Sequence, residues 1–196
     1  MPDHPVKLIV GLGNPGPQHD SNRHNAGVIF LNHLCKSYGG QLRGEQKFFG
    51  EFDSINIDGR DIKLIFPTTF MNHSGKSVSA VCKFYKIQPE NMLVAYDEID
   101  FDVGVTRFKE GGGHGGHNGV RDIINSIGGK RGFFRLRIGV GHPGHKSMVA
   151  NYVLSDPSRS EAAIIMSNIE DAIRIIPKTT EGSWEEAMRF LHSDQG

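Results

Sequence analysis

Short apolar segments alternate along the chain with segments in which apolar residues recur at helical spacing. The expected strands cover residues 6–10, 48–57, 61–66, 92–96, 103–109 and 133–140. The expected helices cover residues 25–38, 75–85, 157–176 and 183–192, and another runs from the glycine-rich segment 111–119 through Ile127. This alternation predicts a single α/β domain over residues 1–196, with a twisted mixed, mostly parallel sheet and helices on both faces.

Polar side chains gather in the segments that follow the expected strands. In open α/β sheets, ligands usually bind at the carboxyl ends of the strands. Segments 11–25, 67–74 and 97–102 follow such strands, and we expect segment 110–119 at the same edge. Their candidate polar residues are Asn14, His24, Asn25, Asn72, Asp97 and Asn118. We therefore predict a polar pocket there.

His24 and Asp97 are candidates for acid–base chemistry within this pocket. Asp97 ends an apolar strand, where a carboxylate can be fixed, and it could accept a hydrogen bond from His24. Such a bond would set the tautomer of His24 and stabilise its imidazolium form while it takes a proton from water. Taken singly, these residues have simpler interpretations: Asn14 as a turn former, Asn118 as a helix cap, and Asp97 as part of an acidic loop.

A nucleotide cofactor is disfavoured. Gly11, Gly13 and Gly16 match the spacing of a dinucleotide-binding loop, but the match is short. Pro15 lies inside the loop, and Lys36 occupies the region where an acid would bind the ribose. A dinucleotide-dependent oxidoreductase therefore remains only a rival interpretation, and we expect no cofactor.

Other catalytic motifs are incomplete. Segment 75–77 resembles the end of a phosphate loop, but Phe70 stands where that motif needs glycine. The sequence has no Gly-x-Ser-x-Gly motif, which disfavours a serine hydrolase. His114 and His117 could suggest a metallohydrolase, but zinc-binding spacings are absent, so we expect both to pack or form hydrogen bonds and no metal to bind.

Positive charge is concentrated in one part of a chain whose formal net charge is zero. Residues 107–146 include eight Lys or Arg residues and two acids. Arg107, Lys109, Arg135 and Arg137 alternate along two expected strands beside the glycine-rich segment. Clustered cations next to backbone amides that begin a helix are typical of phosphate and nucleic-acid binding.

The composition agrees with one ordinary domain of 196 residues, 37% of them hydrophobic. Cys35 and Cys82 lie in apolar helical patterns, so we expect buried free thiols. No apolar run approaches the ~20 residues of a membrane span, and the N-terminus lacks signal-peptide features. These features predict a soluble, cytoplasmic protein.

Several motifs together resemble the bacterial peptidyl-tRNA hydrolase family. They are residues 11–16 (GLGNPG), 22–27 (NRHNAG), 67–75 (PTTFMNHSG), 97–100 (DEID), 111–119 (GGGHGGHNG) and 135–144 (RLRIGVGHPG). They occur in the order of the family, and the resemblance covers about residues 6–192. It implies a metal-independent enzyme, expected to be a monomer, that hydrolyses the ester between a peptide and the 3′ ribose of tRNA.

The resemblance also assigns roles to individual residues. It implies His24 as the catalytic base and Asp97 as the residue that orients it. The substrate-binding residues that it implies are Asn14, His19, Phe70, Met71, Asn72 and Asn118. The expected tRNA contacts are Lys109, Arg137 and His117, with the first two binding the 5′ phosphate.

The sequence departs from the family pattern at two places near these motifs. His19 stands where the family often has tyrosine, so an aromatic ring is kept and a phenol hydroxyl is lost. His145 stands where an acid is frequent, which can add positive charge at low pH. Neither change touches the expected base or its partner. A relative that binds nucleic acid without catalysis would be the remaining rival, and the presence of both His24 and Asp97 argues against it.

Overall fold

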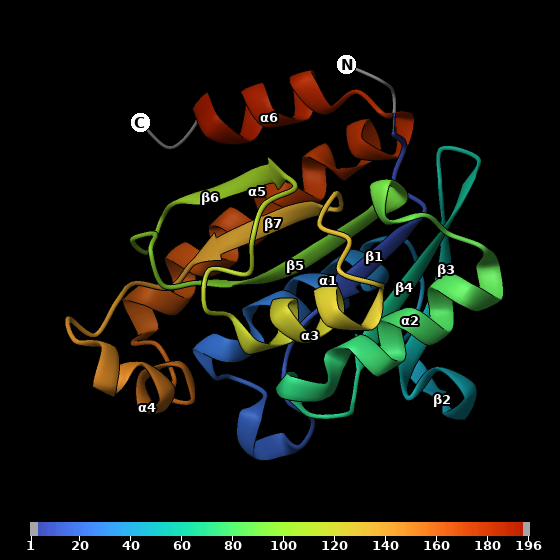
Figure 1. The fold of residues 1–196 in the computed structure, drawn as a ribbon. Coiled ribbons are helices and arrows are strands. Elements are labelled where there is room, and N and C mark those ends of the chain that lie inside the picture. Colours follow the sequence, from blue (N-terminus) through green and yellow to red (C-terminus); the bar gives the residue numbers. More distant parts are fainter. Residues whose placement is uncertain (1–3, 194–196) are drawn as a thin grey trace.

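The protein is a central sheet with helices on both sides (Figure 1). The computed structural model describes residues 4–193; residues 1–3, which belong to the N-terminal segment without signal-peptide features, lie outside this range. The strands are β1 (Leu8–Gly11), β2 (Arg43–Glu45), β3 (Gly50–Ile57), β4 (Arg60–Pro67), β5 (Met92–Glu98), β6 (Thr106–Glu110) and β7 (Phe134–Gly139). The helices are α1 (Ala26–Ser37), α2 (Ser74–Tyr85), α3 (Asn118–Ser126), α4 (Val149–Val153), α5 (Arg159–Glu181) and α6 (Trp184–Ser193).

The seven strands form one mixed sheet in the order β2-β3-β4-β1-β5-β7-β6. Strands β4, β1, β5 and β7 are parallel to one another and form the centre of the sheet. The strands outside them, β3, β2 and β6, pair in antiparallel fashion. The predicted α/β class and mixed, mostly parallel sheet are therefore confirmed.

Side chains of the central strands alternate between two buried clusters, one on each face of the sheet. On β1, Leu8 and Val10 contribute to the cluster under α2 and α3, whereas Ile9 contributes to the cluster under α1, α5 and α6. All three side chains are fully buried. Because both faces are covered, these strands are apolar throughout, as parallel strands between helical layers usually are.

The parallel strands bring their carboxyl ends to one edge of the sheet. The segments after β1, β4, β5 and β7 therefore meet there, as predicted for the first three. The position of the glycine-rich segment 111–117 differs from the prediction. Because β6 is antiparallel to β7, the segment begins at the opposite edge of the sheet. There the backbone N–H of Gly111 donates a hydrogen bond to the carbonyl oxygen of Phe133. Only its far end, from Gly115 to His117, reaches the edge where the other loops meet.

Several predicted boundaries were wrong. Asp97 lies within β5 and does not follow it. Ser74 is the first residue of α2 and not its cap, because its hydroxyl donates to the Met71 carbonyl oxygen at 2.8 Å. Helix α5 continues through Pro177 and ends at the left-handed Gly182. Strand β2 and helix α4, which have three and five residues, were not predicted.

The cysteines are free thiols, as predicted, although Cys82 is only half-buried. Burial raises the pKa of both thiols to about 11. Among residues 4–193, no helix is long and apolar enough to span a membrane.

Gly27 allows α1 to lie against the sheet directly below the edge formed by the carboxyl ends of the parallel strands. A Cβ at this position would overlap the carbonyl oxygen of Ala95 and lie 2.7 Å from the backbone nitrogen of Leu12. Both contacts are with backbone atoms of or just after central strands, so a side chain could be accommodated only by moving α1 or the strands.

Gly27→Ala should therefore lower the free energy of unfolding by about 1–3 kcal/mol or more. The added methyl group would press against backbone atoms, which cannot move aside as a flexible side chain can. Urea denaturation would measure this. Gly44→Ala is the matched control: Gly44 has no atom within 4 Å of a built Cβ and lies on β2, so we expect a change within about 0.5 kcal/mol. Equal losses in the two variants would contradict the role of Gly27.

Candidate active site

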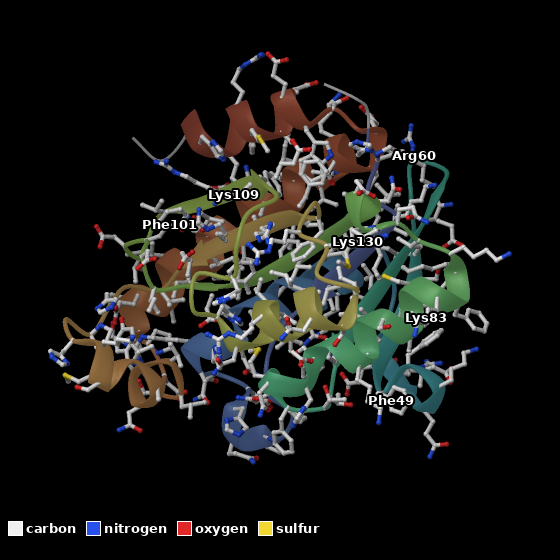
Figure 2. The ribbon with its side chains drawn as sticks, viewed as in Figure 1. Phe49, Arg60, Lys83, Phe101, Lys109 and Lys130 are labelled. Atoms are coloured by element: carbon white, nitrogen blue, oxygen red, sulfur yellow. The ribbon has the colours of Figure 1, made fainter. Side chains whose placement is uncertain are left out.

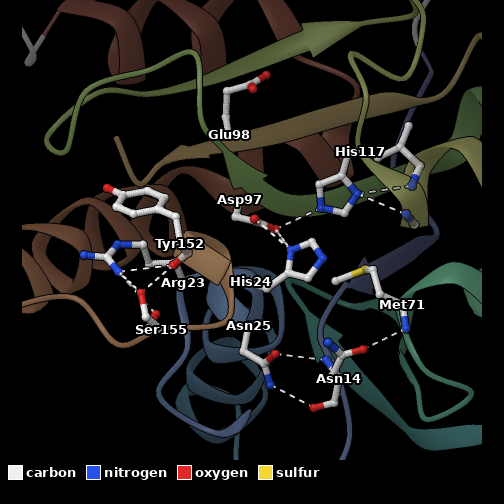
Figure 3. Close-up of polar contacts among 12 residues, drawn as sticks. Asn14, Arg23, His24, Asn25, Met71, Asp97, Glu98, His117, Tyr152 and Ser155 are labelled. Atoms are coloured by element: carbon white, nitrogen blue, oxygen red, sulfur yellow. Dashed lines mark hydrogen bonds and ion pairs between the residues drawn. The ribbon is translucent and has the colours of Figure 1, made fainter. Parts of the chain in front are cut away.

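A cleft of about 740 Å³ lies at the carboxyl edge of the sheet. Loops after β1, β4, β5 and β7 line it together with α4, and it contains His24, Asp97, Asn14 and Met71 (Figure 3). The four central strands thus each contribute to one site, as the chain topology requires.

The centre of the cleft is a hydrogen-bonded pair of His24 and Asp97. The Nδ1 of His24 lies 2.8 Å from Oδ2 and 3.0 Å from Oδ1 of Asp97. An ionised carboxylate only accepts hydrogen bonds, so the proton of a neutral His24 resides on Nδ1. The Nε2 atom is then an unprotonated acceptor, available to a water molecule in the cleft. The contact predicted between these residues, 73 positions apart, is present.

The electrostatics of the pair favour its charged forms. Burial alone would lower the pKa of His24, but the charge of Asp97 and its hydrogen bond raise this pKa above the ordinary 6.5. Burial alone would raise the pKa of Asp97, but interaction with His24 and His117 and the hydrogen bonds from both hold it well below its ordinary value. Asp97 is therefore an anion throughout the physiological range, and it stabilises a proton on His24.

His117 is a second hydrogen-bond donor to Asp97, which the sequence did not reveal. Its Nε2 lies 2.9 Å from Asp97 Oδ1, and its Nδ1 accepts from the backbone amides of Gly119 and Val120 at the start of α3. His117, not Asn118, therefore caps α3. The His117 side chain is 8% exposed and lines the cleft, and the tRNA contact predicted for it stays a prediction.

His24, Asp97 and His117 are close enough to be considered as metal ligands, because their ligand atoms lie within 4.8 Å of one another. A metal on Nε2 of His117 would force the proton onto Nδ1, where two backbone N–H groups already point. The hydrogen bonds at α3 therefore oppose metal binding at His117, in keeping with the expectation of a metal-free site.

Asn14 is held so that only its NH₂ group is free. Its Oδ1 accepts from the backbone amide of Met71 at 2.8 Å. Its backbone is fixed by Asn25, which accepts from Asn14 N at 2.9 Å and donates to Asn14 O at 3.0 Å. Asn25 is 1% exposed and was named only as a pocket residue from the sequence. The arrangement presents an amide donor to the cleft beside His24.

Phe70 and Met71 form the wall next to Asn14. Phe70 has a positive φ of 63°, which costs a non-glycine residue about 1–3 kcal/mol, and its side chain is 57% exposed at the mouth of the cleft. Met71 is buried, and a Cβ at Gly119 would lie 2.5 Å from its sulfur. The glycine after Asn118 therefore lets the start of α3 approach Met71.

Arg23 fixes the backbone next to His24. Its guanidinium donates to Ser155 Oγ at 2.6 Å and to the Tyr152 carbonyl oxygen at 3.2 Å, and it lies 4.0 Å above the Tyr152 ring. It also pairs with Glu161 at 3.6 Å. This anchor was not predicted from the sequence, where the only available signal was an arginine directly before His24.

The remaining predicted substrate contacts have different positions. Asn72 and Asn118 are exposed and line the cleft, and Asn118 Oδ1 accepts from Arg121 at 3.0 Å. His19 does not line this cleft; its Nδ1 donates to Asn22 Oδ1 at 2.9 Å, and Asn22 in turn donates to Asp156. The structure therefore places His19 with the anchors of the His24 loop.

The predicted basic strand pair is present on one face of β6 and β7. Register places Arg107 opposite Arg137 and Lys109 opposite Arg135. Lys109 is exposed, and Figure 2 shows it on β6, with Phe101 on the same side of the molecule. Arg135 is 1% exposed and donates to the Gly112 carbonyl oxygen, so it holds the glycine-rich segment and does not face solvent.

Arg137 is paired within the protein. Its Nη2 lies 2.7 Å from Glu98 Oε1, and its guanidinium stacks 4.4 Å from the centre of the Phe101 ring. A phosphate that binds Arg137 must therefore share it with Glu98, whereas Lys109 offers its ammonium group directly.

An α/β sheet that carries a buried histidine–carboxylate pair and a free amide donor at its carboxyl edge is suited to hydrolysis by activated water. The sequence profile of a family described as "Peptidyl-tRNA hydrolase" matches residues 8–196. A peptidyl-tRNA hydrolase of Saccharophagus degradans is 51% identical over 196 residues, covering 98% of each chain, and one of Pseudomonas paraeruginosa is 48% identical over 190 residues. The crystal structure of peptidyl-tRNA hydrolase from Acinetobacter baumannii superposes with a TM-score of 0.93 at 44% identity, covering 96% of this chain and 95% of that chain. The chain belongs to the peptidyl-tRNA hydrolase family.

The geometry predicts the effect of removing the charge of Asp97. In Asp97→Asn, burial continues to disfavour the imidazolium while the attraction that opposed it is lost, so the pKa of His24 should fall below that of the parent protein. NMR titration of the His24 ring would measure it. Asp100→Asn, an exposed position nearby, is the control and should leave this pKa unchanged; a higher pKa in Asp97→Asn would contradict the assignment.

Proposed function

We propose that the chain hydrolyses the ester bond between a peptide and the 3′ ribose of tRNA, with His24 as the base that activates water. Membership of the family supports the reaction. The observation that carries the residue assignment is the bond from His24 Nδ1 to the buried Asp97, which leaves Nε2 as an acceptor inside the cleft.

In this mechanism, water attacks the ester carbonyl carbon while His24 Nε2 takes its proton. Asp97 keeps the proton on Nδ1 in place and stabilises the imidazolium that forms. The tetrahedral intermediate then collapses: the ester C–O bond breaks, and the 3′ oxygen of the ribose leaves with the proton that His24 returns. An aminoacyl ester is activated, so the reaction needs no covalent nucleophile and no metal.

Asn14 supplies a donor for the substrate. Because its Oδ1 is occupied by Met71 N–H, its NH₂ group is directed to an acceptor, such as a carbonyl oxygen of the peptide. Asn72 is exposed and lines the same cleft, where it can bind a second polar group of the peptide backbone. A free aminoacyl ester lacks the peptide amide, so it would leave part of this site unpaired, at a cost of about 1–3 kcal/mol.

His24→Ala tests the proposed base. Turnover of an N-blocked aminoacyl-tRNA should fall by about 10²–10⁴ or more, because the variant has no group to accept the proton. The dissociation constant for tRNA should stay close to that of the parent, since the exposed cations are unchanged. A variant that keeps full turnover would refute His24 as the base.

We also propose that Lys109 contacts a tRNA phosphate, assisted by Arg137. Lys109 is exposed on β6, and its Nζ lies over Gly112, where a Cβ would come within 2.9 Å of it. The absence of a side chain at residue 112 leaves this ammonium group open. Arg137, held by Glu98 and Phe101, presents a fixed guanidinium on the same face of the sheet.

Lys109→Ala should weaken tRNA binding and reduce the slope of log K against log salt by about 1, because one phosphate contact is lost. Filter binding at several salt concentrations would measure it. Lys83→Ala is a matched control: this lysine is exposed on α2, away from Lys109 (Figure 2), and should leave the slope unchanged. The same slope in the parent and in Lys109→Ala would exclude the phosphate contact.

A further inference from the structure

We propose that His117 is a positioning residue that shares Asp97 with the catalytic base and thereby sets the basicity of His24. The inference rests on the proposed role of His24 and extends it to a residue that acts through Asp97. It gives His117 a role in addition to the tRNA contact that the sequence predicts, which stays a prediction.

The hydrogen bonds of His117 fix its tautomer. Nδ1 accepts from the backbone amides of Gly119 at 3.2 Å and Val120 at 3.4 Å. A nitrogen that accepts two N–H groups carries no proton, so the ring proton lies on Nε2 and points to Asp97 Oδ1, 2.9 Å away. The His117 ring is held further by Tyr96, whose ring meets it edge-on at a centroid distance of 5.0 Å.

The same bonds occupy both ring nitrogens of His117. Nδ1 accepts the amides at the positive end of α3, and Nε2 donates to Asp97. By contrast, His24 has its Nε2 open to the cleft and can gain a proton. The two histidines that share Asp97 therefore have different roles. His117 donates a hydrogen bond to the carboxylate, whereas His24 gains and loses a proton during the proposed reaction.

Sharing the carboxylate limits how strongly Asp97 holds a proton on His24. Asp97 Oδ1 receives hydrogen bonds from both rings, and Oδ2 receives one from His24 alone. Each N–H donor stabilises part of the negative charge of the Asp97 carboxylate. Without His117, more of that charge acts on His24, so its imidazolium form becomes more stable and its pKa rises. A base with a higher pKa is protonated over a wider pH range, and in that range it cannot accept a proton from water.

Other charged groups surround the three residues but are the same in every variant compared below. They are Tyr96 and Glu98 on β5, Arg135 and Arg137 on β7, and His142 and Lys146 at the cleft wall. Among the described residues, the hydrogen bonds to the Asp97 side chain come from His24 and His117.

Two substitutions separate the two bonds of His117. In His117→Asn the amide oxygen replaces Nδ1 as the helix cap, for which asparagine is well suited, but the side chain is too short to reach Asp97. In His117→Gln the amide nitrogen replaces Nε2 as donor to Asp97, and the cap is lost. The experiment measures, for the parent and both variants, the pH dependence of kcat/KM, the pKa of His24 by NMR and the Tm.

We expect the acidic limb of kcat/KM and the NMR pKa of His24 to rise by about one unit in His117→Asn and to stay near the parent values in His117→Gln. The Tm should fall more in His117→Gln, which loses the cap. A purely structural role predicts no pKa change in either variant, and that result would overturn the inference. An equal shift in both, or a lower pKa in His117→Asn, would overturn it too.

If His117→Asn does not fold, His117→Ser takes its place, because serine also caps a helix and is too short to reach Asp97. A raised His24 pKa in His117→Ser supports the inference, and an unchanged one overturns it. The NMR titration needs no substrate. Failure of His24→Ala to lose turnover would therefore overturn the proposed mechanism, while the NMR values would still report on the electrostatic coupling of His117 to His24.

Discussion

The site depends on burying one negative charge. Asp97 is 3% exposed on a central strand, and an unpaired carboxylate there would be too costly to remain ionised. The fold compensates it with N–H donors from His24 and His117, each supplied by a different loop. The close approach of α1 at Gly27 and of α3 at Gly119 brings the two loops within reach. Helix packing and acid–base chemistry are therefore connected through a single side chain.

Around this charge, the polar residues divide into fixed and open groups. Arg23 and Asn25 are buried and donate hydrogen bonds to backbone carbonyl oxygens, and they hold the loops on either side of His24. Asn72, Lys109 and Phe70 are exposed, where a large substrate can reach them. Rigid placement serves the reacting atoms, for which small displacements are costly. Exposure serves recognition, since a tRNA must contact the enzyme outside the cleft.

Much of the framework follows from local sequence pattern. The apolar run of β1 and its position before a glycine-rich loop predicted a central parallel strand, and the ends of β1, β4 and β5 predicted where the polar residues would meet. The direction of β6 could not be predicted, because strand pairing is decided by register with β7 and not by the residues of β6 alone. The bond of His117 to Asp97 was missed for a related reason. In a glycine-rich loop the backbone path is set by positive φ angles and by the carbonyl contact of Gly112 with Arg135, neither of which leaves a periodic signal. His24 and Asp97 were paired from chemistry and resemblance, whereas the anchors Arg23 and Ser155, 132 residues apart, had no such guide.

The occupied oxygen of Asn14 has a consequence for small molecules that bind the cleft. An amide side chain normally offers a donor and an acceptor and can rotate to suit either ligand. Here Met71 N–H holds the oxygen, and Asn25 holds the backbone behind it. Compounds that present an acceptor to this position would find a partner already oriented, whereas compounds that present a donor would meet another donor. The site therefore discriminates between ligands of the same shape by the direction of a single hydrogen bond.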